Sequence, residues 1–207
     1  MGVGDEAKEL LRMAGGRLVI SEGVVSPQFV ADYGAPAGMV NMHARALQEE
    51  WAGKRVVLPG AVLILFRQNT VMTVVMGVPG HLCLLDGMLA VAAFAMRYRP
   101  TSVALVSSGL LLPDAKDMPD DIIEKLLVAA SKGSEPAGNV QVTRVITVAA
   151  RNIQGDVALS VFTPMMRDGV IAGFAREDMP TEEILAGGNP CMALEAMFLW
   201  REREENG

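Results

Sequence analysis

Apolar positions recur with helical spacing over residues 36–51. Gly53 follows this segment and supplies a C-terminal cap, because glycine adopts the left-handed conformation with little strain. The spacing i, i+3, i+4, i+7 and i+11 marks one face of a 3.6-residue period and predicts a helix. The residues of this face are Val40, His43, Ala44, Leu47 and Trp51.

Short apolar runs predict strands in the first half of the chain. The run 61–66 is continuously apolar, which is typical of a strand covered on both faces. Gln68-Asn69 then turns the chain into a strand at 70–76. We expect further strands at 17–20 and 103–106, and a helical turn in the stretch that Ser26-Pro27 begins.

Three β-rich runs follow one another near the C-terminus, at 140–150, 156–163 and 170–175. Gln154-Gly155 and Asp168-Gly169 separate them, and Asp-Gly is a strong hairpin signal. The pattern predicts a three-stranded antiparallel meander, with Gly169 at a positive φ.

Residues 82–98 are apolar nearly all round, which predicts a buried central helix. Pro100 prevents its continuation. The strand–helix–strand order is compatible with a parallel crossover, which would be right-handed. Asn189-Pro190 begins a second helix, whose apolar residues are Leu194, Met197 and Phe198. Further helices are expected at 5–13 and from Pro119 to about residue 131.

This order of elements predicts a single α+β domain over residues 1–207. Its sheet is expected to be mixed but largely antiparallel, with helices packed on it. Residues 1–35 are expected to form a loosely packed N-terminal segment, and the charged residues 201–207 a solvated tail.

Composition narrows the class of protein. Of 207 residues, 51% are hydrophobic, and the formal net charge is -6. The scattered Lys and Arg residues form no basic patch, which argues against a nucleic-acid groove. Two distant cysteines make no disulfide framework. We expect no signal peptide in the acidic N-terminus, and the longest apolar run, 87–96, is about half a membrane span. We expect a soluble cytoplasmic protein without a membrane segment.

The stretch Ser107-Ser108-Gly109 interrupts an apolar run. A serine nucleophile would need a base, for which His81 is the natural candidate. The G-x-S-x-G and phosphate-loop contexts are both missing. We therefore expect these residues to end or bend a buried strand, with their hydroxyls bonded to nearby backbone.

Other chemistry-bearing residues are isolated. His81 and Cys83 are two residues apart, so they would not face one another on a helix. His43 is expected to be a satisfied buried histidine. Cys191 stands in the first turn of a helix, where the dipole lowers a thiol pKa, but no basic neighbour is visible in the sequence. Packing is the favoured role of Cys191, and we expect no metal and no cofactor.

Three motifs follow one another in the second half of the chain: an apolar helix with a following strand at 90–107, then Gly155-Asp156, then 164–169. This arrangement resembles a loose group of small uncharacterised bacterial and phage proteins. In that group an acidic and an aromatic residue often follow the strand serine, whereas this chain has Ser108-Gly109. The resemblance implies a compact α/β domain and no particular activity.

Two functions follow from these features. The leading hypothesis is a non-catalytic accessory or protein-interaction domain, which binds a protein partner or a second copy of itself. The alternative is a small hydrolase or transferase with a pocket near Ser107, Ser108 and His81.

Overall fold

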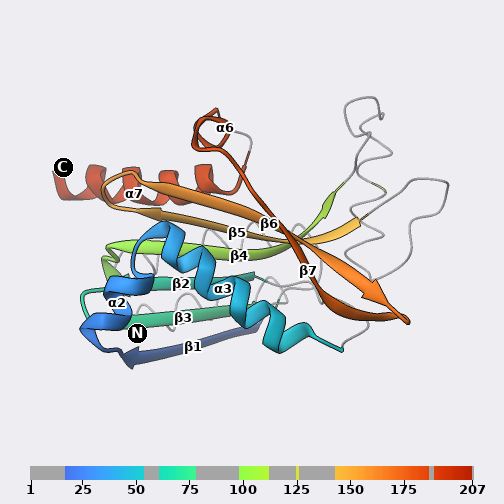
Figure 1. Ribbon diagram of the computed structural model, residues 1–207. Helices are drawn as coiled ribbons and strands as arrows, with labels where there is room; N and C mark the ends of the chain where they lie inside the picture. The colour runs from blue at the N-terminus through green and yellow to red at the C-terminus, as the bar shows by residue number, and fades with distance from the viewer. Residues whose placement is uncertain are drawn as a thin grey trace.

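The computed structural model describes residues 17–53, 61–77, 98–111, 125, 143–186 and 189–206; at 17–19, 50–51, 61, 76–77, 108–111, 143–144 and 200–206 it describes the backbone alone. Within these ranges, seven strands form one sheet in the order β1-β3-β2-β4-β5-β6-β7 (Figure 1). In chain order they are β1 (Arg17–Val24), β2 (Ala61–Arg67), β3 (Thr70–Gly77), β4 (Ser102–Leu111), β5 (Thr143–Asn152), β6 (Val157–Arg167) and β7 (Val170–Asp178).

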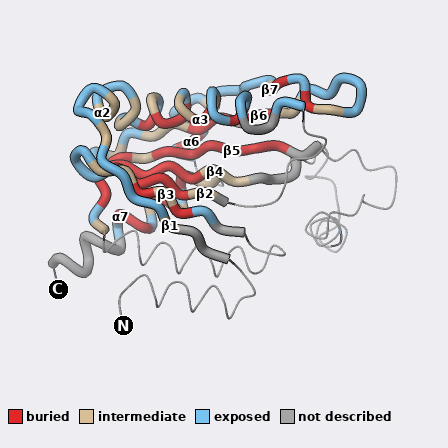
Figure 2. Tube along the Cα trace, turned by 90° about the horizontal axis from the view of Figure 1, so that it is seen from below, coloured by how far each residue is buried: buried red, intermediate tan, exposed pale blue. Residues whose placement is uncertain are grey.

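Four described helices cover the sheet on two sides. They are α2 (Pro27–Tyr33), α3 (Pro36–Trp51), α6 (Thr181–Leu185) and α7 (Cys191–Asn206). Figure 2 shows α2 and α3 on one side of the sheet and α7 on the other. Ser26 caps α2, because its Oγ accepts the N–H of Phe29 at 3.1 Å. Among the described helices, none combines the length and apolarity that crossing a bilayer requires.

Both faces of the central strands are buried. Along β2, Leu63 and Leu65 point toward α7, whereas Ile64 and Phe66 point toward α3. This alternation arises because successive side chains of a strand point to opposite faces. The α7 side also holds Leu194, Met197 and Phe198. The expectation of a strand covered on both faces is confirmed.

The C-terminal meander is confirmed. β5, β6 and β7 are successive antiparallel neighbours, and each extends beyond the predicted bounds at its C-terminal end. Asp168 and Gly169 have φ values of 52° and 75°. Positive φ at both central residues is the signature of a type I′ hairpin turn, which matches the twist of the flanking strands.

The helices predicted before β2 and after Pro190 are also present. α3 spans Pro36–Trp51 as predicted, and its Val40 and Leu47 are buried. α7 begins directly after Asn189-Pro190. The helix α6 was not predicted, because Thr181–Leu185 is too short to show a helical period.

The sheet is not mixed: every described pairing is antiparallel. β3 and β4 do run in the same direction, because both are antiparallel to β2, but β2 lies between them. The order of elements is thus compatible with a crossover between parallel strands that are not neighbours, whereas the expectation of a mixed sheet is wrong for the described strands. The predicted central helix 82–98 lies outside the described residues except for Tyr98, and the helices at 5–13 and after Pro119 lie outside them except for Lys125.

Candidate functional site

Ser107 and Ser108 lie within a continuous strand. β4 pairs with β5 without a shift from Ser102 to Leu111, so Ser107 lies opposite Thr147 and Ser108 opposite Ile146. The strand therefore does not end here, whereas a bend at these residues and hydroxyl bonds to nearby backbone stay predictions. The pairing of β4 with β2 stops at Ser107, but its pairing with β5 continues to Leu111. Ser107 is half-buried. His81 lies outside the described residues, so its proximity to the serines stays a prediction.

Cys191 opens α7 and packs into the core. Its N–H donates to Asn189 Oδ1 at 3.0 Å, and its thiol lies 3.8 Å from the carbonyl oxygen of Ala158. Burial raises the pKa of the Cys191 thiol to about 11, although a backbone hydrogen bond at Ala150 and the charge of Arg151 act in the opposite direction. The thiol is therefore neutral at physiological pH, and a nucleophilic thiolate is disfavoured.

Arg151 is the basic neighbour of Cys191 that the sequence does not reveal. It comes from β5, and its Nη2 lies 3.3 Å from Glu195 Oε1 on α7. Its Nε is buried and has no hydrogen-bond partner among the described residues. The Arg151–Glu195 ion pair links β5 to α7 beside the neutral Cys191 thiol.

His43 is buried, but it is not satisfied as expected. The residue is 8% exposed, and its Nε2 has no hydrogen-bond partner among the described residues. Burial lowers the pKa of His43 to about 4, so the imidazole is neutral at pH 7. The described residues hold no group of three or more His, Cys, Asp or Glu side chains placed to bind a metal ion.

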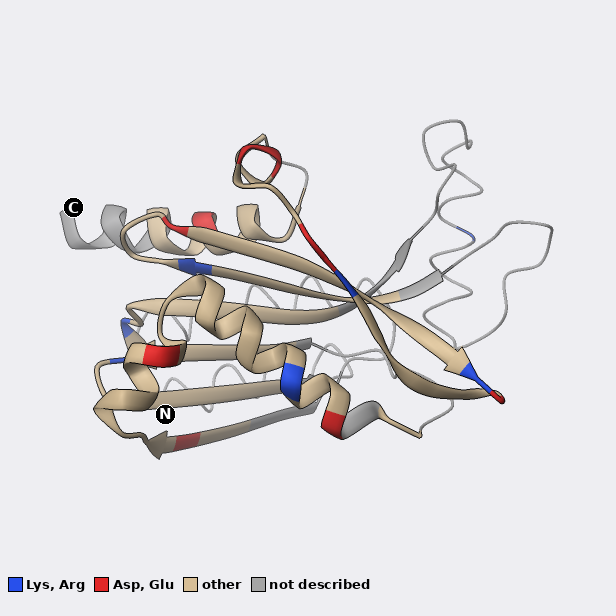
Figure 3. Cartoon of the chain, viewed as in Figure 1, with Lys and Arg blue, Asp and Glu red and all other residues tan. Residues whose placement is uncertain are grey.

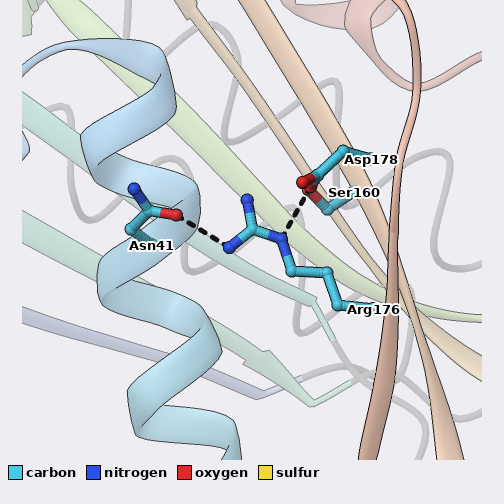
Figure 4. A network of polar contacts seen from close by, with 4 residues as sticks. All are labelled: Asn41, Ser160, Arg176 and Asp178. Carbon is cyan, nitrogen blue, oxygen red and sulfur yellow. Dashed lines mark hydrogen bonds and ion pairs between the residues drawn. The ribbon is translucent and has the colours of Figure 1, made fainter.

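A polar network joins β6, β7 and α3 (Figure 4). Arg176 on β7 donates from Nε to Asp178 Oδ1 at 2.6 Å and from Nη1 to Asn41 Oδ1 on α3 at 2.7 Å. The buried Ser160 hydroxyl, on β6, donates to the same carboxylate oxygen of Asp178. The guanidinium of Arg176 also lies 5.9 Å from the ring centre of Phe162. Residues of three elements, α3, β6 and β7, thus meet in one network.

The electrostatics of this network indicate a structural role rather than a catalytic one. Burial alone would raise the pKa of Asp178, but hydrogen bonds from Ser160 and Arg176 and the charge of Arg176 outweigh it, so the pKa is lowered. A carboxylate with a lowered pKa is a weak general base. Ser160 is 1% exposed, so its hydroxyl is also shielded from solvent. The contacts hold β7 against β6 and α3.

β7 is one edge of the sheet, and α3 closes part of it. The N–H of Gly53, which follows α3, donates to the carbonyl oxygen of Ile171 at 2.9 Å. The Arg176 contact with Asn41 holds the opposite end of the strand. The β6–β7 ladder also shifts register between Met165 and Met166. Covering elements, charged residues and bulges are ordinary means by which proteins protect an edge strand.

Among the described strands, β1 is the other edge of the sheet, and it differs from β7. All eight residues of Arg17–Val24 pair with β3 without a shift in register. The N–H of Val25 donates to the carbonyl oxygen of Asn69 at 2.8 Å, so Val25 and every second residue before it direct their backbone groups toward β3. The intervening residues direct theirs away from the sheet; they are Leu18, Ile20, Glu22 and Val24. We call this outward-facing row the β1 edge.

Side chains near the β1 edge combine an acid with apolar surface. Ile20 packs against the core on the α7 side, and Val24 is 85% exposed. Between them, Glu22 forms the acidic segment of β1 seen in Figure 3. Its Oε1 accepts the hydroxyl of Tyr98 at 3.5 Å. Burial and the Glu22 carboxylate raise the pKa of Tyr98, and Arg67 Nη1 donates to the Tyr98 carbonyl at 3.2 Å.

The motifs behind the resemblance to small bacterial and phage proteins fall in separate parts of the sheet. Gly155-Asp156 lies in the β5–β6 connection, and residues 164–169 form the end of β6 and its turn into β7. Residues 90–97 lie outside the described residues, and residues 102–107 belong to β4. Comparisons of the chain with protein-family models, with curated proteins and with solved structures found no match.

Proposed function

We propose that this protein is a non-catalytic protein-interaction domain that binds an extended segment of a protein partner by adding it as a strand at the β1 edge. The observation that carries the proposal is the unshifted pairing of β1 with β3, which leaves the backbone groups of Ile20, Glu22 and Val24 directed outward. Such a row forms a ladder of hydrogen bonds with an incoming strand, and pockets for alternate side chains add specificity.

The difference between the two edges supports this choice of surface. β7 has a register shift beside it, contacts from α3 and a salt bridge between Arg176 and Asp178. The sequence of β1, RLVISEGV, contains no proline and no lysine, which are common means of blocking an edge. Among the described residues, elements and contacts cover the β7 edge, whereas the backbone groups of β1 keep the geometry to which a further strand can bind.

The composition of the chain bears on the class of partner and on the location of the domain. The net charge of -6 and the absence of a basic cluster in the sequence favour a protein partner over a nucleic acid. We propose a soluble, cytoplasmic, single-domain protein, and a second copy of the chain is the competing occupant of the edge.

The test compares two substitutions at one position. Val24→Pro removes an outward N–H while leaving the bonds of β1 to β3 in place, and Val24→Ala keeps that N–H. The probe is a labelled peptide of sequence Thr-Val-Thr-Lys-Thr-Val-Thr, whose binding is followed by fluorescence anisotropy. Val24→Ala shortens a side chain of the edge but keeps its N–H, so it should bind the peptide at most a few-fold more weakly than the wild type. Val24→Pro should bind about two- to tenfold more weakly than Val24→Ala, since it removes one hydrogen bond of the ladder.

Equal unfolding midpoints of the two variants serve as the control for folding. Equal binding by folded Val24→Pro and Val24→Ala proteins would contradict the proposal. Concentration-dependent dimerisation that only Val24→Pro abolishes would identify a second copy as the occupant in place of a different partner.

A further inference from the structure

We propose that the strand bound at the β1 edge presents a lysine or arginine opposite Glu22, with apolar side chains at the two nearest positions on the same face. This inference rests on the proposed function and adds the chemistry of the partner. It identifies a basic, alternating β-segment as the ligand.

The register of β1 defines which side chains would meet. Because Glu22 directs its N–H and C=O outward, an antiparallel partner forms a hydrogen-bonded pair with it. Residues directly opposite in such a pair place their Cβ atoms about 5 Å apart on one face of the sheet. Every described pairing of this sheet is antiparallel, so the same orientation is expected for the added strand.

The neighbours of Glu22 on that face are apolar. Ile20 packs against the core, and Val24 is 85% exposed. In an antiparallel partner, the residues opposite these two stand two positions on either side of the residue opposite Glu22. Apolar side chains at those positions would cover Val24 and extend the surface that Ile20 begins, because burial of apolar area is favourable.

The charge of Glu22 selects the central residue. Its side chain is exposed, and the hydrogen bond that its carboxylate accepts from the Tyr98 hydroxyl is long at 3.5 Å. A cation opposite Glu22 would form a cross-strand ion pair, whereas an acid would be repelled. The formal net charge of -6 adds a weaker general preference for basic segments.

Three peptides test this preference: Thr-Val-Thr-X-Thr-Val-Thr, with Lys, Gln or Glu at X. Each is titrated by fluorescence anisotropy into the wild type, Glu22→Gln and Glu22→Lys. On the wild type, affinity should fall in the order Lys, Gln, Glu, by roughly two- to fivefold at each step. Glu22→Gln should bind the three peptides with nearly equal affinity. Glu22→Lys should bind the Glu peptide most tightly and the Lys peptide most weakly.

The two proposals fail in different ways. Equal affinities for the three peptides, weakened together in Val24→Pro, would overturn the charge preference and leave strand addition intact. A charge preference that persists in Glu22→Lys would overturn the role of Glu22. A Glu22-dependent preference that folded Val24→Pro retains in full would overturn strand addition, and binding of none of the peptides would contradict both proposals.

Discussion

The N–H of Val25 donates to the carbonyl oxygen of Asn69 at 2.8 Å, just beyond the last paired residue of β1. Asn69 belongs to the turn that joins β2 to β3. The bond thus fixes β1 to the end of a hairpin and determines which of its backbone groups face β3. The outward direction of the groups at Glu22 and Val24 follows from it, and so does the proposed binding edge.

The buried histidine predicts a specific dependence of stability on pH. His43 titrates near 6.5 when unfolded and at about 4 when folded. The unfolded chain therefore binds more protons between these values, and stability is lost as the pH falls from about 6.5 to about 4, by up to about 3 kcal/mol. His43→Leu should lose less free energy of unfolding between pH 7 and pH 4.5 than the wild type in urea titrations. Equal losses in the two proteins would refute the assignment.

The buried thiol predicts slow modification. A pKa raised from 9.0 to about 11 lowers the thiolate fraction of Cys191 by about a hundredfold at neutral pH. In a Cys83→Ser background, Cys191 should react with a chromogenic disulfide reagent at least that much more slowly in buffer than in denaturant. Similar rates under the two conditions would show that the thiol is accessible and active.

The Ser160–Asp178 contact predicts that removal of the Ser160 hydroxyl lowers the free energy of unfolding. Ser160→Ala deletes a buried donor to a carboxylate, and hydrogen bonds to charged groups contribute about 1.5–3 kcal/mol. Ser21→Ala is the matched control, because it is the same change at an exposed residue of β1 and should stay within about 0.5 kcal/mol. Urea denaturation measures both, and equal values would contradict the structural role of the network.

Two glycines allow a test of backbone conformation without steric contact. A Cβ at Gly169 or at Gly23 would meet no atom within 4 Å, but Gly169 has a φ of 75°. Gly169→Ala should therefore destabilise the fold by about 1–2 kcal/mol, whereas Gly23→Ala should be neutral or slightly stabilising. A comparable loss in both variants would show that conformation at the β6–β7 turn is not the cause.

Elements with strong local signals were predictable from the sequence. The apolar face of α3 and the Asp168-Gly169 turn are set by neighbouring residues, so periodicity and turn chemistry suffice. β1 was expected to stop at residue 20. Its pairing with β3 extends the strand to Val24, which illustrates how sheet contacts override local propensity.

The position of each strand in the sheet was not predictable in the same way. Nothing local places β2 between β3 and β4, since neighbour choice depends on long-range contacts. The same holds for the network of Asn41, Ser160 and Arg176, whose members come from different elements. At Ser107-Ser108-Gly109 the polar residues suggested that the strand ends or bends, but its pairing with β5 continues through all three residues.

The most direct measurement of strand addition is residue-resolved amide hydrogen exchange, followed by NMR, with and without the Thr-Val-Thr-Lys-Thr-Val-Thr peptide. If the peptide adds as a strand, the amides of Ile20, Glu22 and Val24, which face outward, gain protection when it is bound. The amides of Ser21 and Gly23, which face β3, should change little. Saturating peptide that leaves the outward amides as exchangeable as before, or that protects β7 instead, would contradict the account.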